Sequence, residues 1–303
     1  MSQVGAGLHE VPLLDARELT DARLEALAAR LEADHPGPAG AAIAYALRSP
    51  GKRVRPALVL AAFRAVGGSG EGIGGVCAAV ETVHTYSLVH DDLPCMDDDD
   101  RRRGRPTTHV VFDVPQATRA GWLLVPVAVE LLAAAAAELG LPDATLGRMA
   151  GVLLEASGVR GMVGGQWLDL EGEGRALDLV SLRAVHGAKT GALIRASCEL
   201  GGIAGRAAPE QLAALGAYGG DLGLAFQVAD DVLDATATTV QLGKTAGRDA
   251  ALAKSTYVAE LGVDGARQEA AALADRAVAA LVAAGLATSH LVALAQYVVA
   301  RQS

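Results

Sequence analysis

Helical periodicity is the feature of this 303-residue sequence that most constrains its fold. Apolar residues recur every three or four positions along most of the chain, and no segment alternates as a strand does. The interruptions are short and rich in Gly, Pro and polar residues, at 34–40, 67–75, 104–115, 171–177, 201–209 and 235–249. None resembles an interdomain linker. We therefore predict one all-α domain over residues 1–303, a bundle of about ten or more helices, with residues 1–18 as a flexible N-terminus.

Composition supports this fold class and narrows the possible partners. Aromatic residues make up only 3% of the chain, so Ala, Leu and Val supply the core, which favours close helix packing. The most apolar stretch, 123–137, is shorter than a bilayer span of ~20 residues, so we predict a buried helix and no membrane span. A net charge of −9 argues against nucleic acid. Three scattered cysteines and no signal-peptide pattern predict reduced thiols and a cytoplasmic protein.

Two aspartate clusters follow predicted helices, one in each half of the chain. Residues 91–100 contain six aspartates and precede three arginines, whereas the second cluster contains Asp230, Asp231 and Asp234. Acids at a helix C-terminus oppose the helix dipole and repel one another, so they need a cation. Oxygen ligands without Cys or His select Mg²⁺, Mn²⁺ or Ca²⁺. Together with the arginines, these clusters predict a site for a metal-bound diphosphate.

Both predicted helices carry a polar face that leads to the acidic cluster. His84, Ser87 and Asp91 share one face of the helix predicted over 74–93. In the second helix the corresponding face holds Gly223, Phe226, Gln227, Asp230 and Asp234. A solvated helix surface is the alternative interpretation, but a core-facing stripe would use Leu or Val at these positions.

Further cations are weaker signals. Residues 51–56 (GKRVRP) place three cations beside a Gly and before a helix, which suits either a metal-free diphosphate or a solvated helix entry. Lys189, Lys244 and Lys254 are isolated cations beside small residues. An EF-hand starting at residue 91 is excluded, because Met96 and Arg102 occupy the places of its Gly and Glu. Walker and dinucleotide-binding motifs are absent from the sequence.

The motifs resemble the trans-isoprenyl diphosphate synthase (polyprenyl synthetase) family, and within it the bacterial farnesyl diphosphate synthases most closely. Seven ordered segments carry the resemblance, which covers nearly the whole chain: 51–56, 84–94, 102–104, 161–166, 189–193, 226–231 and 254–257. The resemblance implies an isoprenoid synthase-like helical bundle around a central cavity, a homodimer, and about three Mg²⁺ ions, with Mn²⁺ as a substitute. It also implies that isopentenyl diphosphate condenses with an allylic diphosphate, dimethylallyl or geranyl.

The resemblance also implies roles for individual residues. Metal binding is expected at Asp91, Asp92, Asp97, Asp230, Asp231 and Asp234. The allylic diphosphate is expected at Arg102, Lys189, Gln227, Lys244 and Lys254, and isopentenyl diphosphate at Lys52, Arg55, His84 and Arg103. Catalysis near the carbocation is expected to involve Lys189, Thr190 and Gln227.

Product length is expected to depend on Tyr86 and its neighbour Ser87. Tyr86 lies five residues before Asp91, or roughly 7.5 Å along a helix, where its ring can floor the tail cavity. With the insertion in the first aspartate motif, the resemblance implies a short product, farnesyl diphosphate first and geranylgeranyl diphosphate second. The alternative is that Tyr86 only fills the core.

Departures from the family pattern keep other functions open. Trp122 stands where the family has a buried-helix Asp, Pro50 where it has a Gly, and Ala237-Thr238 where it often has Gly-Asp. A class I terpene cyclase and a non-catalytic partner subunit of another prenyl synthase are the alternatives. The basic segment 51–56 argues against the first, and two complete aspartate motifs argue against the second.

Overall fold

The computed structural model describes residues 10–172, 174–236 and 255–300, with side chains from residue 12 onward. Helices dominate the described residues, which confirms the predicted all-α fold class. They are α1 (Glu10–Asp34), α2 (Pro38–Leu47), α3 (Val54–Ala65), α4 (Ile73–Asp91), α5 (Thr108–Phe112), α6 (Val114–Glu138), α7 (Asp143–Ser157), α8 (Met162–Gly172), α9 (Leu179–His186), η1 (Gly187–Gly191), α10 (Ala192–Ala204), α11 (Pro209–Thr236), α14 (Tyr257–Ala283) and α15 (Ser289–Ala300). The strands β1 (Arg101–Arg102) and β2 (Arg105–Pro106) form a small hairpin.

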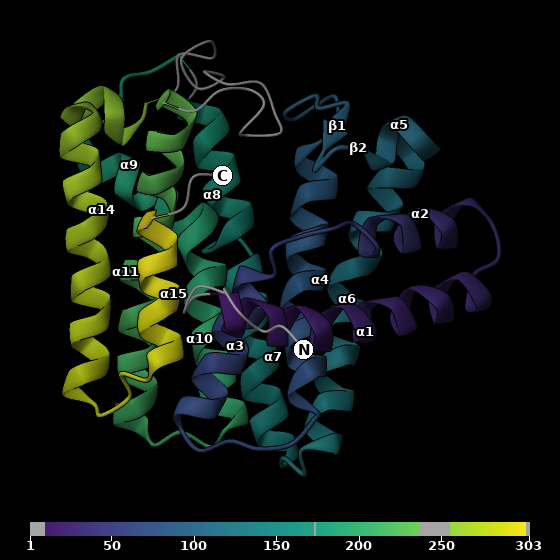
Figure 1. The fold of residues 1–303 in the computed structure, drawn as a ribbon. Coiled ribbons are helices and arrows are strands. Elements are labelled where there is room, and N and C mark those ends of the chain that lie inside the picture. Colours follow the sequence, from purple (N-terminus) through teal and green to yellow (C-terminus); the bar gives the residue numbers. More distant parts are fainter. Residues whose placement is uncertain (1–9, 173, 237–254, 301–303) are drawn as a thin grey trace, which may run out of the picture.

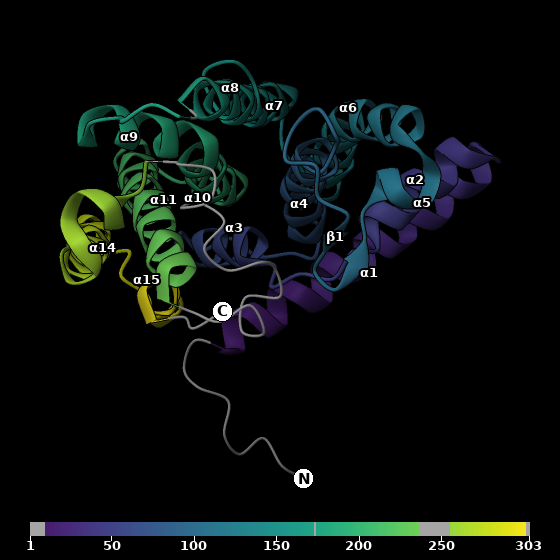
Figure 2. The same ribbon diagram turned by 90° about the horizontal axis from the view of Figure 1, so that it is seen from above.

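The two helices that carry the aspartate clusters each pack against other helices. α4 packs against α6 and α3, while α11 packs against α14 and α10. Figure 1 shows the C-terminal ends of α4 and α11 at the same upper end of the molecule. Seen from above, the two helices stand on opposite sides of its centre, with α3 and α8 completing the ring (Figure 2). This arrangement points both acidic helix ends toward the same part of the molecule.

Small residues allow the helices to approach closely, as the composition predicts. A Cβ at Gly75 of α4 would lie 2.8 Å from the Cβ of Ala135 of α6, and one at Gly201 of α10 would lie 2.2 Å from the carbonyl oxygen of Val59 in α3. Distances this short exclude any side chain at these glycines without movement of a neighbour. Close packing here fixes α3, α4 and α10, which carry site residues at their ends.

Several local predictions are wrong. Residues 10–18 are helical rather than part of a flexible N-terminus, α10 continues through 201–204, and a hairpin forms within 101–106. α6 has 25 residues and is long and apolar enough to cross a bilayer, with 44% of its most apolar window buried. Core helices of water-soluble proteins pass the same test, and α6 packs against α4. Trp122 is 66% exposed, so it does not replace a buried residue.

Candidate active site

The first acidic cluster folds back over the end of α4. Asp91 is the last helical residue, and the backbone N–H of Asp97 donates to its carbonyl oxygen at 2.8 Å. Asp98 adopts a left-handed conformation (φ 52°), which lets the chain reverse; Asn and Asp accept this conformation more readily than most residues. A second reversal uses Arg103 and Gly104 at φ 52° and 78°. These turns bring the arginines back toward the aspartates that precede them.

Arg102 forms hydrogen bonds with two aspartates of this cluster. Its guanidinium donates to Asp92, and also to Asp99 at 3.2 Å. Asp92 is 4% exposed, and burial raises its pKa to about 6 even though Arg102 opposes that shift. Asp92, a predicted metal ligand, therefore already has the guanidinium of Arg102 as a partner and holds this side chain beside the cluster.

Asp91, the first aspartate of this cluster, lines a cavity between α4 and α8. Burial raises its pKa to about 6; Lys189 works against this shift, and the nearby Asp97 adds to it. A divalent cation would offset this unfavourable burial of negative charge. The influence of Lys189 also shows that η1 lies close to the end of α4.

The three aspartates of the second acidic cluster have different surroundings. Asp230 lines a cavity that it shares with residues of α4. Asp231 accepts hydrogen bonds from the backbone N–H of Tyr257 at 2.8 Å and from Gln227 Nε2 at 3.3 Å. Asp234 is 7% exposed. Asp231 Oδ2 thus anchors the start of α14 and Oδ1 holds Gln227, so both oxygens have protein partners, and the metal role of Asp231 stays a prediction.

A π-helical turn, η1, carries the lysine and threonine predicted to lie near the reacting carbon. Two glycines allow other helices to approach its backbone. A Cβ at Gly165 of α8 would lie 2.1 Å from the backbone nitrogen of Lys189, and one at Gly223 of α11 would lie 2.5 Å from the Cα of Gly191. Lys189 Nζ donates to Asp169 at 2.7 Å, and Thr190 Oγ1 donates to Gln227 Oε1 at 3.0 Å. π-helical turns occur frequently at functional sites.

A basic cavity of 580 Å³ joins the two halves of the site. From the first half it is lined by the predicted isopentenyl diphosphate residues Lys52, Arg55, His84 and Arg103, together with Arg102. Thr190, Phe226 and Asp230 line it from the second half. Burial lowers the pKa of His84 well below its usual value, and Arg55 and Arg103 lower it further, so the imidazole is neutral at pH 7. A neutral His among guanidinium groups can share their anionic ligand without adding repulsion.

A second cavity, of 510 Å³, extends from Asp91 along α4 and α8. Tyr86, Ser87 and His90 line it, and the Tyr86 ring meets the His90 ring edge-on at a centroid distance of 4.8 Å. A Cβ at position 121 would lie 2.0 Å from His90 Nε2, so Gly121 of α6 makes room for this ring. The cavity has Asp91 at one end and an aromatic pair in its wall, so it suits a ligand with an apolar tail whose anionic head is joined to Asp91 by a cation.

The donor set fits a hard cation that completes its shell with substrate oxygens. Over residues 10–172, 174–236 and 255–300, no three His, Cys, Asp or Glu side chains are gathered tightly enough to hold a metal alone. Asp91, Asp97, Asp230 and Asp234 supply only oxygen, and Mg²⁺ usually keeps several non-protein ligands. Lys244, Lys254 and Ala237-Thr238 lie outside the described residues.

Sequence reasoning missed several site residues. Asp169 holds Lys189, and Arg53 pairs with the buried Glu81. Gln166 lines the cavity along α8, is 7% exposed, and has no hydrogen-bond partner among the described residues. Helical spacing could have found two of them, because Glu81 and Asp169 each stand three residues from a residue in a recognised motif, His84 and Gln166.

The chain is similar to known proteins both in sequence and in fold. The polyprenyl synthetase family profile matches residues 39–282. Farnesyl diphosphate synthase of Escherichia coli (strain K12) is 45% identical over 258 residues, which are 83% of this chain and 85% of the relative. An FPP/GFPP synthase of Zymomonas mobilis is 35% identical, with a TM-score of 0.80 over 96% of this chain and 99% of the other. A Helicobacter pylori geranyltransferase complexed with magnesium and isoprenyl diphosphate is 31% identical, with a TM-score of 0.80 over 98% of both chains.

An all-α fold with two acidic helix ends at the same end of the molecule (Figure 1), each beside a cavity, is typical of the class of isoprenoid-forming helical enzymes. Within that class, the chain belongs to the polyprenyl synthetase family. It is a short-chain trans-prenyltransferase, so the predicted activity is confirmed.

Proposed function

We propose that this enzyme condenses isopentenyl diphosphate with dimethylallyl or geranyl diphosphate and releases farnesyl diphosphate. The observation that carries the proposal is the basic cavity, where Lys52, Arg55 and His84 share one space with Thr190 and Asp230. Isopentenyl diphosphate bound to the cations would lie beside the residues predicted to hold the allylic partner. Two diphosphate substrates held side by side can react without a further search for orientation.

Metal binding completes the allylic site in this proposal. Asp91 and Asp97 from the first cluster, with Asp230 and Asp234 from the second, would hold Mg²⁺, about three ions per site, with Mn²⁺ as a substitute. When bound, Mg²⁺ supplies charge neutralisation for the diphosphate as the allylic C–O bond ionises. Asp92 places Arg102 against the same diphosphate.

The remaining chemistry is assigned to η1 and α11. Lys189 leaves Asp169 to neutralise the departing diphosphate, and its electrostatic attraction to Asp91 favours this position. Thr190 and Gln227, joined by a 3.0 Å hydrogen bond, present oxygen lone pairs toward the allylic carbocation. The double bond of isopentenyl diphosphate attacks this cation, and the proton is then lost to the released diphosphate.

Product length is set by the cavity along α4 and α8. Tyr86 lines it one to two turns below Asp91, where its ring, edge-on to that of His90, would limit how far a prenyl tail extends. A tail bound by its diphosphate at Asp91 would meet this pair, which favours farnesyl diphosphate over longer products.

A homodimer is the second part of the proposal. Apolar side chains are exposed on α6, α7 and α8, which lie along one side of the molecule (Figure 2): Trp122, Leu123, Leu154, Val163, Trp167 and Leu168. Exposed apolar surface of this extent is typical of an interface. A second copy of the chain would cover it, in a cytoplasmic enzyme. Sedimentation equilibrium tests this assembly, and a monomer at micromolar concentration would contradict it.

One assay tests the function. Purified protein is incubated with Mg²⁺ and isopentenyl diphosphate plus dimethylallyl, geranyl or farnesyl diphosphate, and products are identified by mass spectrometry. Extension to farnesyl diphosphate and no further is expected. Geranylgeranyl diphosphate would move the product assignment to the longer chain. A cyclised hydrocarbon formed without isopentenyl diphosphate would point to a terpene cyclase, and no product in any mixture to a partner subunit.

A further inference from the structure

We propose that Arg53 is a positioning residue of the isopentenyl diphosphate site: it holds the loop at 49–52 in the shape that presents Lys52 to the substrate. The inference rests on the proposed function, which places isopentenyl diphosphate in the basic cavity. Arg53 stands between Lys52 and Arg55 in the sequence, yet its side chain is only 5% exposed. Its charge is therefore used inside the protein.

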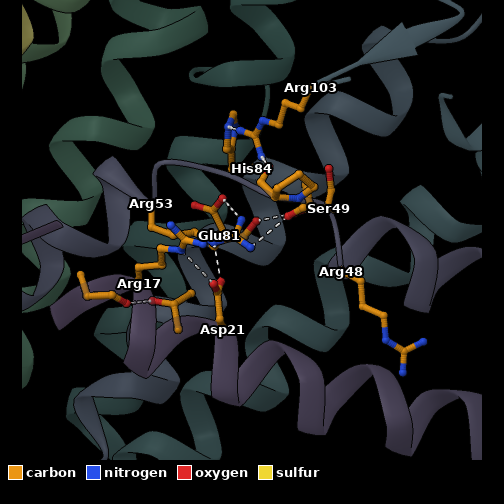
Figure 3. A network of polar contacts seen from close by, with 12 residues as sticks. Arg17, Asp21, Arg48, Ser49, Arg53, Glu81, His84 and Arg103 are labelled. Atoms are coloured by element: carbon orange, nitrogen blue, oxygen red, sulfur yellow. Dashed lines mark hydrogen bonds and ion pairs between the residues drawn. The ribbon is translucent and has the colours of Figure 1, made fainter. Parts of the chain in front are cut away.

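The guanidinium of Arg53 joins three separate elements. Nε donates to Asp21 of α1 at 2.8 Å, Nη1 to Glu81 of α4 at 2.8 Å, and Nη2 to the carbonyl oxygen of Ser49 at 3.0 Å. Figure 3 shows this network, with Arg53 at its centre. Each of the three nitrogens of the side chain thus has an acceptor within the protein, so the guanidinium is held in place at the wall of the cavity.

The backbone of Arg53 has an unusual conformation that the same contacts hold in place. It adopts a left-handed conformation (φ 56°, ψ 39°) directly before α3 begins at Val54. A side chain disfavours this region, so the surrounding contacts must hold the residue there. The reversal turns the Arg53 guanidinium toward Glu81, and the Arg53–Glu81 pair lines the same cavity as Lys52 and Arg55.

A second arginine holds the next carbonyl of the same loop. Arg103 Nη1 donates to the carbonyl oxygen of Pro50 at 2.8 Å, and its Nη2 lies 3.2 Å from His84 Nε2. A Cβ at Gly51 would lie 2.7 Å from Arg103 Nη1 and 2.9 Å from Arg53 Nη1, so Gly51 fits between two guanidinium groups. Consecutive carbonyls are therefore fixed by two arginines, one of which also contacts the substrate-site His.

Glu81 makes this crowding of cations tolerable. It is 2% exposed and stands one helical turn before His84, on the same face of α4. Burial works to lower the pKa of Arg53, but the Glu81 and Asp21 carboxylates raise it overall. A lysine could not bond three acceptors in different directions from one planar group. The network thus needs an arginine at position 53, not only a positive charge.

The test is Arg53→Lys, with Arg48→Lys as the matched control. Arg48 also pairs with α1, through Glu25 at 2.9 Å and Glu32 at 2.8 Å, but it points away from the other labelled residues of the network (Figure 3). For Arg53→Lys we expect the KM for isopentenyl diphosphate to rise roughly 10- to 100-fold. Removing the hydrogen-bond partners that orient a metal-binding side chain has an effect of this size. The KM for geranyl diphosphate should stay within about twofold, and Arg48→Lys should change neither constant beyond about twofold.

Two outcomes would overturn the inference: an unchanged KM for isopentenyl diphosphate, or equal rises in both KM values with a lowered melting temperature. If Arg53→Lys does not fold, Gly51→Ala displaces the same two guanidinium groups and is expected to raise only the isopentenyl diphosphate KM. Lys52→Ala distinguishes a failure of this inference from a failure of the proposed isopentenyl diphosphate site. If Lys52→Ala leaves that KM unchanged, the assigned site is wrong; if only Lys52→Ala raises it, the positioning role of Arg53 is wrong.

Discussion

Replacing Tyr86 with Ala is expected to lengthen the product by one isoprene unit. Without the ring, we expect the floor of the cavity to pass to Val83 and Thr82, which are fully buried and lie on the same face of α4. These residues precede Tyr86 by three and four positions, so the floor moves by ~4.5–6 Å, about the length of one isoprene unit. The variant should lose about 2 kcal/mol of stability, less than the ~3–5 kcal/mol of a fully buried aromatic residue, because Tyr86 is only partly buried.

The assay compares wild type, Tyr86→Ala and Tyr86→Phe with Mg²⁺, isopentenyl diphosphate and geranyl diphosphate. Mass spectrometry should find geranylgeranyl diphosphate for the Ala variant. The Phe variant keeps the ring against His90, so it should still stop at farnesyl diphosphate. A folded Ala variant with the wild-type product distribution would refute the reasoning, and Tyr86 would then be only a core residue.

Three further predictions follow from the site and the burial of particular side chains. Chelation by EDTA should abolish turnover and added Mg²⁺ should restore it; turnover in EDTA would contradict the metal site. Trp122→Asp should weaken the proposed homodimer, because Trp122 is 66% exposed on the single chain and belongs to the apolar surface assigned to the second copy; an unchanged dimer in sedimentation equilibrium would contradict that interface. At pH 8 a disulfide reagent should modify one thiol, the exposed Cys95. Burial raises the pKa of Cys77 to about 12 and also raises that of Cys198, so rapid labelling of either in folded protein would contradict their burial.

The sequence predicts the fold class well because helical periodicity is a local signal. It also predicts the helix that leads to Asp91, expected over 74–93 and found at Ile73–Asp91. The π-helical turn at Gly187–Gly191 could not be predicted in this way. It depends on the close approach of Gly165 and Gly223 from two other helices, and such contacts have no local pattern in the sequence.

Which aspartate does what also depends on contacts across the chain. Asp91, Asp92, Asp230 and Asp231 look equivalent as two pairs in the sequence. In the structure Asp92 holds Arg102, which follows ten residues later, and Asp231 anchors the start of α14 at Tyr257, 26 residues away. Residue type and spacing located both clusters, but only the tertiary fold separates the aspartates that face the cavities from those that hold protein groups.

We propose that the acidic ends of α4 and α11 bind one diphosphate together. A double-mutant cycle of Asp91→Asn and Asp230→Asn tests it, with the Kd of a non-ionisable thiolo analogue of geranyl diphosphate measured in Mg²⁺ by calorimetry. Residues that share a ligand through common ions should show a coupling free energy of roughly 1 kcal/mol or more. Effects that add to within about 0.5 kcal/mol would mean that Asp91 and Asp230 act at separate sites, which contradicts the account.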